Sequence, residues 1–213
     1  MKVAVIGNGP SYNTYDGWGD FVIGCKLGAP LSINYKFCAC AHASVFDRIL
    51  DDSWNGVFTT RMIYPVHMHY ILRQWYTPAQ QSKILSKLSI PYDSDLYSKL
   101  PKPFQPNLAR LASRNLKGFD YNTKHKISTG HWAIIFVMAL YDVSEIRCYG
   151  FDAHFDPTLK IQSLSHSISA SPEELERRKR RGWDYDQGAV RWNETIDFLR
   201  ELYQIPIHLV PPK

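Results

Sequence analysis

The fold is decided by residues 128–152, which read STGHWAIIFVMALYDVSEIRCYGFD. Ser128 and Thr129 stand where a helix cap is expected, and the apolar residues after them predict a helix over His131 to Leu140. The run Glu145 to Tyr149 then predicts a strand, which the following glycine ends. A helix that leads directly into a short strand is typical of an α/β fold.

Other short apolar runs predict the remaining strands of the same sheet. They are Lys2 to Ile6, Phe21 to Cys25, Tyr35 to Ala41, Val57 to Ile63 and, near the end of the chain, Ile205 to Val210. An amphipathic helix over about Gln187 to Tyr203 precedes the last of them. We therefore predict an α/β, Rossmann-like domain over residues 1–213, with a mostly parallel sheet, flanking helices and a lid at about residues 155–181.

The composition is that of a folded protein without structural cross-links. Hydrophobic residues make up 45% of the chain and charged residues 21%, which excludes disorder by composition. The cysteines form no C-x-x-C pair, which argues against a zinc site and a disulfide scaffold; they are Cys25, Cys38, Cys40 and Cys148.

The first apolar run is too short for a signal peptide, and no run reaches the roughly 18 residues of a membrane span. We expect a soluble protein in the cytoplasm, a reducing compartment.

The turn after the first strand reads Gly7-Asn8-Gly9-Pro10-Ser11. Two glycines at this place predict that the backbone approaches something closely, and a helix near Ser11 would offer free N–H groups to a phosphate. The dinucleotide fingerprint fails because its third glycine position holds Tyr12, and no Walker lysine follows. The turn therefore predicts either a nucleotide site or a plain tight connection.

A second candidate lies at Ser128-Thr129-Gly130, before the apolar helix. These residues predict either helix capping alone or contacts with a phosphate or ribose. The second interpretation gains weight because open α/β sheets bind ligands outside the carboxyl ends of their strands, where helix N-termini gather.

Together these motifs resemble those of the sialyltransferases. The matching patterns are V-I-G-N-G-P-S up to Ser11, S-T-G with its apolar helix and E-I-x-x-Y-G-F-D up to Asp152, and F-L-R-E-L-Y-x-I-P-I from Phe198 onward. The animal-type family has a P-S-[ST]-G motif that runs on to a Y-G-F strand end, and the small bacterial type begins with G-N-G-P-S. Similar turns occur in flagellin-glycosylating transferases and in an archaeal pterin diphosphokinase family. The resemblance covers residues 1–15 and about 127–210.

The resemblance implies transfer of a sialic-acid-like sugar from a CMP-activated donor to a hydroxyl of a glycan or other acceptor, without a metal or another cofactor. It implies that the turn 7–11 contacts the nucleotide and that residues 128–130, before the apolar helix, contact its phosphate or ribose. It also implies that residues 150–152, after the strand, form one wall of the nucleotide site. The corresponding residues are Gly7, Asn8, Gly9, Ser11, Ser128, Thr129, Gly130, Gly150, Phe151 and Asp152.

This chain departs from the family at the residues that act on protons and phosphate. His154 stands where the bacterial type has a tyrosine that helps the phosphate leave, and we expect it either to take that role as a donor or to mark a different chemistry. Lys26 stands where the bacterial type has an asparagine that reaches the nucleotide, and we expect it to reach a phosphate as a cation. The family's general base, a histidine before the last helix, is replaced by Gln187. His166 from the lid segment, Asp184 and Asp186 are the alternatives for the base, and a solvated loop histidine is the plain interpretation of His166.

The positive charge of the chain is compatible with anionic partners such as nucleic acid. The formal net charge is +5, and the run Arg177 to Arg181 predicts either contact with nucleic-acid backbone or a solvated helix face. Two alternative functions follow, namely the same fold modifying nucleic acid, and a non-catalytic module that binds a nucleotide or a partner. The small size is compatible with a homo-oligomer that completes the site.

Overall fold

The computed structural model describes residues 1–25, 33–39, 46, 49–50, 61–63, 72–87, 128–156 and 185–212, without the side chains of residues 61–63, 87, 185–189 and 191. In the described part of the chain, six strands form one sheet: β1 (Lys2–Ile6), β2 (Phe21–Cys25), β3 (Phe37–Ala39), β4 (Arg61–Ile63), β5 (Glu145–Tyr149) and β6 (Ile207–Leu209). The helical elements whose bounds the structure describes are η1 (Pro10–Thr14), α3 (Pro78–Lys87), α6 (Thr129–Leu140), η3 (Asp152–His154) and α8 (Tyr185–Tyr203). The two η elements are short 3₁₀ helices.

The sheet is parallel throughout, in the order β4-β3-β2-β1-β5-β6. The chain starts in the middle and builds outward through β2 and β3 to β4, then crosses back to place β5 on the other side of β1. Val5 therefore lies opposite Ile23 of β2 and Cys148 of β5. The strand order reverses between β1 and β5, and such a switch point is where open α/β sheets bind ligands.

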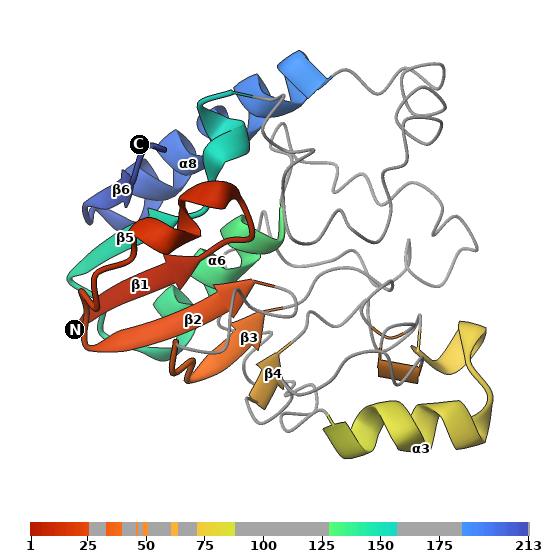
Figure 1. Cartoon of the computed structure of the whole chain (residues 1–213). Helices are drawn as coiled ribbons and strands as arrows, with labels where there is room; N and C mark the ends of the chain where they lie inside the picture. The colour runs from red at the N-terminus through yellow and green to blue at the C-terminus, as the bar shows by residue number, and fades with distance from the viewer. Residues whose placement is uncertain are drawn as a thin grey trace.

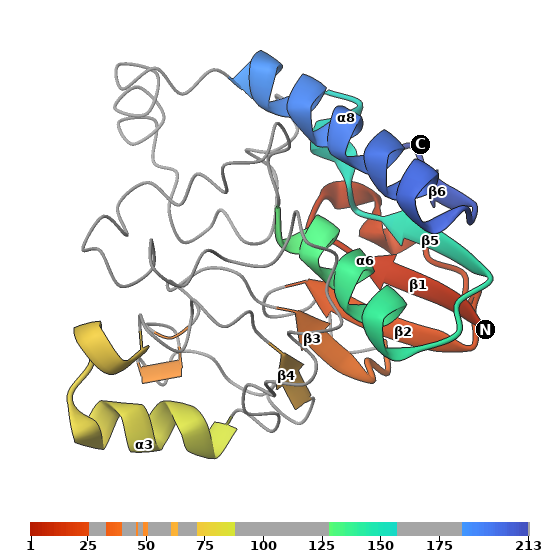
Figure 2. The same ribbon diagram turned by 180° about the vertical axis from the view of Figure 1, so that it is seen from behind.

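One face of the sheet is covered by α6 and α8, as Figure 2 shows. Alternate side chains such as Val3, Val5 and Ile23 point to this face, since successive residues of a strand face opposite sides. Every residue of α6 from Thr129 to Val137 is buried, which explains why that helix is apolar all round. Each fully buried Val or Ile contributes about 1.5–3 kcal/mol through the hydrophobic effect.

The other face is covered by η1 and the turn that follows it, which lie in front of the sheet in Figure 1. The ring of Tyr15 meets that of Tyr149 edge-on, with 5.2 Å between centroids. The Arg147 guanidinium lies 4.2 Å from the centre of the Trp18 ring. Aromatic side chains thus cover the face that carries no long helix among the described residues.

Helix α3 lies apart from the sheet in both views (Figures 1 and 2). Its Ile84 is buried, as are Leu72 and Phe46. The rings of Phe46 and Tyr76 meet edge-on at 5.8 Å, and Lys83 donates from Nζ to the carbonyl oxygen of Leu50 at 3.0 Å. These two contacts join α3 and the segment before it to residues 46–50.

The structure confirms the predicted fold class. Strands β1, β2 and β5 have the predicted bounds, β6 is shorter than predicted, and α6 begins two residues before the predicted start. The helix predicted near Ser11 is present as a 3₁₀ helix of five residues, Pro10–Thr14. The predicted lid lies outside the described residues except for Phe155 and Asp156. Within the described residues, every helix is too short or too polar to cross a membrane.

Candidate functional site

The ends of β1 and β5 remain paired beyond the strands themselves. Gly7 N–H donates to the carbonyl of Tyr149 at 2.7 Å, and Gly9 N–H donates to that of Gly150 at 2.9 Å. A Cβ on Gly7 would overlap the Gly150 carbonyl oxygen, and one on Gly9 would overlap Oδ2 of Asp152. The close approach predicted for the two glycines is therefore an approach to the end of β5.

Ser11 and Asp152 join the same two segments by a pair of buried hydrogen bonds. Ser11 Oγ accepts from the N–H of Gly150 at 3.0 Å, and Ser11 N–H donates to Asp152 Oδ2 at 3.0 Å. The two side chains are 3% and 1% exposed. The N–H of Ser11, in the first turn of η1, is therefore not available to a phosphate, because the Asp152 carboxylate already accepts it.

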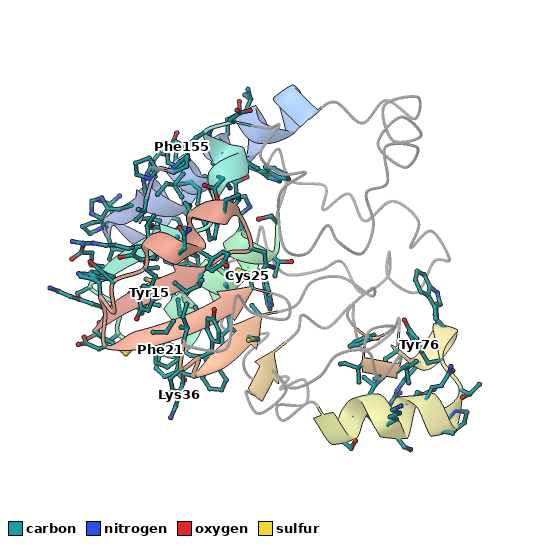
Figure 3. The ribbon with its side chains drawn as sticks, in the orientation of Figure 1. Tyr15, Phe21, Cys25, Lys36, Tyr76 and Phe155 are labelled. Carbon is teal, nitrogen blue, oxygen red and sulfur yellow. The ribbon has the colours of Figure 1, made fainter. Side chains whose placement is uncertain are left out.

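Asn8 extends this contact toward the next strand. Its Nδ2 donates to the carbonyl oxygen of Cys25 at 3.1 Å. Cys25 is the last residue of β2 and is labelled in Figure 3. The side chain is partly exposed. Asn8 is thus oriented at the carboxyl edge of β1 and β2, where its amide oxygen can accept a hydrogen bond from a ligand.

The start of α6 packs against the same edge. Ser128 Oγ accepts from His131 N–H at 3.4 Å, and Ser128 N–H donates to His131 Nδ1 at 2.9 Å. This is a capping box with histidine in the place usually held by Glu or Gln, and it confirms the predicted cap. A Cβ on Gly130 would overlap the ring of Phe151, so the helix start and the end of β5 are in direct contact.

Two buried oxygens at this edge have no hydrogen-bond partner in the described part of the chain. They are Thr129 Oγ1, in the first turn of α6, and Asp152 Oδ1, the second carboxylate oxygen. Burying a polar group without a partner costs about 1–3 kcal/mol. The partial positive charge of a helix N-terminus stabilises negative charge nearby, so this edge combines donors at α6 with an acceptor at Asp152.

His154 is held between α6 and α8. Its Nδ1 lies 2.9 Å from Asn193 Oδ1, and Asn193 Nδ2 donates to the carbonyl oxygen of His154 at 2.9 Å. Its ring lies 5.4 Å from that of His131, 5.6 Å from Phe151 and 5.7 Å from Trp192. Phe155, labelled in Figure 3, follows it and is 46% exposed. Sequence reasoning missed Asn193, since an asparagine within an amphipathic helix gives no signal of its distant partner.

The remaining candidates fall outside what the structure describes. Lys26, His166, Asp184 and the run Arg177 to Arg181 lie outside the described residues, and Asp186 lies in α8 without a described side chain. Their roles stay predictions, as do the ligand contacts predicted for the residues that the structure brings together. Of the four catalytic candidates, only His154 has a described side chain.

Burial lowers the reactivity of the Cys148 thiol. The side chain of Cys148 in β5 is fully buried, and this burial raises the pKa of its thiol well above the ordinary value. A thiol in that state is not a nucleophile. Among the described residues, no three His, Cys, Asp or Glu side chains gather in a way that could hold a metal ion.

Comparisons with known proteins add little to this geometry. No protein-family model matches the sequence, and no curated protein matches it significantly. Among solved structures, the crystal structure of alpha-2,3-sialyltransferase from Campylobacter jejuni in apo form is similar, with a TM-score of 0.43 and 13% identity. The match covers 98% of this chain and 74% of that chain. Similarity at this level carries no functional argument, which has to come from the site itself.

Proposed function

We propose that the protein is a glycosyltransferase that moves a sialic-acid-like sugar from a CMP-activated donor to an acceptor hydroxyl, without a metal ion. One observation carries the proposal. The two motifs on which the resemblance rests, 7–11 and 128–152, are far apart in the sequence yet hydrogen-bonded at the switch point of the sheet. A ligand site is expected at that place on physical grounds alone.

The proposed roles follow from the chemistry of each group. Asn8 recognises the nucleotide through its amide, and the N-terminus of α6 receives the phosphate, because its first N–H groups and the helix dipole favour an anion. Asp152 and Ser11 hold the two strand ends in register. His154 donates a proton to the departing phosphate, and the base is one of His166, Asp184 and Asp186.

The transfer itself forms one bond and breaks one. The acceptor oxygen bonds to the anomeric carbon of the sugar while the bond from that carbon to the phosphate oxygen breaks. The base accepts the hydroxyl proton, and CMP leaves with the bonding electron pair on its phosphate oxygen. His154 neutralises the charge that develops on that oxygen.

The first test is thermal stability with CMP, CDP, UDP, GDP, ATP and NAD. A ligand that binds only the folded state at about 100 times its Kd adds about 2.7 kcal/mol, which corresponds to a rise of about 5–10 °C in Tm for a domain of this size. We expect stabilisation by CMP that Asn8→Ala abolishes. Asn13→Ala, a control at an exposed asparagine of η1, keeps it.

The possible outcomes separate the candidate functions. Stabilisation by CMP followed by transfer from a CMP-sugar to a hydroxyl acceptor supports the proposal. Stabilisation by CMP without turnover across a panel of acceptors favours a non-catalytic binding module. No response to any cytidine nucleotide refutes the proposed donor.

A further inference from the structure

The positive charge of the chain is concentrated between residues 53 and 127. This stretch holds 11 Lys or Arg residues and three Asp or Glu residues, whereas the rest of the chain holds 14 and 17. Residues 53–92 contain no Asp or Glu at all. The net charge of +5 therefore comes wholly from this stretch, since the remainder is net acidic. Such an asymmetry indicates contact with an anionic surface or polymer.

Residues 72–86 are the part of this stretch whose side chains the structure describes. They comprise α3 up to Ser86 and the six residues before it, and they lie apart from the sheet in Figures 1 and 2. Trp75 is 55% exposed, Leu85 is 41% exposed, and Arg73 is exposed as well. The exposed side chains of Arg73, Trp75 and Leu85 define the α3 surface.

Contacts beneath the α3 surface hold it in place. The ring of Tyr76, labelled in Figure 3, meets that of Phe46 edge-on at 5.8 Å, and Ile84 is fully buried. Leu85 follows Ile84 by one residue, or about 100° around the helix, and points outward for that reason. Trp75 and Leu85 are thus held in water although each is next to a residue that packs inward.

The face of α3 around Leu85 is formed by short, uncharged side chains. Ala79, Ser82 and Ser86 are exposed, and their spacing of three and four residues places them on the same side of the helix as Leu85. Short side chains let a broad surface come close to Leu85. The face is therefore suited to a flat partner rather than to a protruding one.

We propose that the α3 surface docks on a lipid bilayer that contains anionic lipids. The charged side chains described within residues 72–86 are Arg73 and Lys83, and both are cations, which complements the negative charge of such a membrane. Tryptophan prefers the boundary between headgroups and acyl chains, and Leu85 adds apolar area that enters the same layer. The docking is peripheral and reversible, because one Trp and one Leu bury little apolar area.

The apolar side chains decide between a bilayer and nucleic acid. Nucleic-acid backbone is bound chiefly by Lys and Arg that neutralise phosphates. Two of the three side chains that define the α3 surface are apolar instead, and a leucine gains nothing from a phosphate backbone. A bilayer with anionic headgroups takes both the cations and the apolar side chains.

The test is co-sedimentation of the whole chain with vesicles of phosphatidylcholine alone or of phosphatidylcholine mixed with phosphatidylglycerol. We expect binding to the mixed vesicles, a much weaker response to the neutral ones, and a fall in binding at high salt because salt screens the attraction. The fluorescence of Trp75, taken as the difference between the wild type and Trp75→Phe, should shift to shorter wavelength when the mixed vesicles are added.

Single substitutions locate the contact. Arg73→Gln should lower the partition constant for mixed vesicles by about 5-fold, the effect of one charge near such a surface. Trp75→Ala and Leu85→Ala should each lower it by about 5-fold or more. Leu202→Ala is the matched control and should leave it unchanged, because Leu202 is 39% exposed on α8, next to Glu201. All four positions are at least partly exposed, so the Tm of each variant should stay within about 2 °C of the wild type.

Each other outcome overturns the proposal. Equal binding to the two kinds of vesicle removes the part of the anionic lipid, and binding that Trp75→Ala and Leu85→Ala leave unchanged places the contact elsewhere. Binding to single-stranded DNA without binding to mixed vesicles assigns the charge to nucleic acid. Self-association that Trp75→Ala abolishes, again without vesicle binding, assigns the α3 surface to a second copy of the chain. These measurements need no nucleotide and no turnover, so their result is independent of the proposed function.

Discussion

Gly7→Ala tests the contact that joins the ends of β1 and β5. The new Cβ would overlap the carbonyl oxygen of Gly150 and lie 2.9 Å from its carbonyl carbon. Both are backbone atoms of a paired segment, so no side-chain rotation relieves the overlap. The strand ends must separate instead.

The cost of this separation has two parts. Overpacking in a closely packed interior costs about 1–3 kcal/mol. Separation also weakens the hydrogen bonds from Gly7 N–H to Tyr149 and from Gly9 N–H to Gly150, each worth about 1 kcal/mol. We therefore expect Gly7→Ala to lower the free energy of unfolding by about 3 kcal/mol.

The assay is urea unfolding followed by tryptophan fluorescence, with Gly17→Ala as the matched control. Gly17 has φ of +87° and nothing within 4 Å of a new Cβ, so its substitution costs only the left-handed backbone strain of about 1 kcal/mol. If Gly7→Ala costs no more than Gly17→Ala, the packing of the two strand ends is refuted.

Three further predictions concern the same edge and the core beneath it. Ser11→Ala should lower the free energy of unfolding by about 1–3 kcal/mol in urea, because the buried N–H of Gly150 loses its acceptor; an unchanged midpoint would contradict this. Ser128→Ala should cost about 1 kcal/mol through loss of the α6 cap, whereas Ser86→Ala on the exposed face of α3 should cost less than about 0.5 kcal/mol in the same assay. Burial raises the pKa of the Cys148 thiol above its ordinary value of 9.0, so the unfolded chain loses this proton at a lower pH than the folded protein does. The contribution of the buried thiol to the free energy of unfolding is therefore fully present below about pH 9 and is lost as the pH rises above it. One proton changes the free energy of unfolding by up to about 1.4 kcal/mol per pH unit, so Cys148→Ala should flatten the alkaline fall of that free energy, measured by urea unfolding between about pH 8 and pH 10; a slope equal to that of the wild type would contradict this.

Local patterns in the sequence were sufficient to predict the class of fold. The bounds of β1, β2 and β5 follow from short β-branched runs that end at glycine or at polar residues, and these signals depend on neighbouring residues alone. The cap at Ser128 was equally predictable, since capping joins residues one turn apart.

The kind of helix at residues 10–14 was not predictable in the same way. The sequence signal, a proline and a serine after a glycine turn, is shared by α and 3₁₀ helices. The partner of the Ser11 N–H was not predictable either, because Asp152 accepts it from a segment 141 residues away. A contact of that length leaves no periodic trace in the chain.

The sequence by itself determined which segments become strands and helices, which residue types stand at their ends, and which glycines allow a close approach. Those properties depend on steric and hydrophobic preferences that act within a few residues. Only the tertiary structure decided that Gly7 and Gly9 approach β5, that Ser11 uses its N–H internally, and that Asn193 contacts His154. These depend on hydrogen bonds between segments brought together by the crossover from β1 to β5, and the direction of such bonds is settled only when donor and acceptor meet in space.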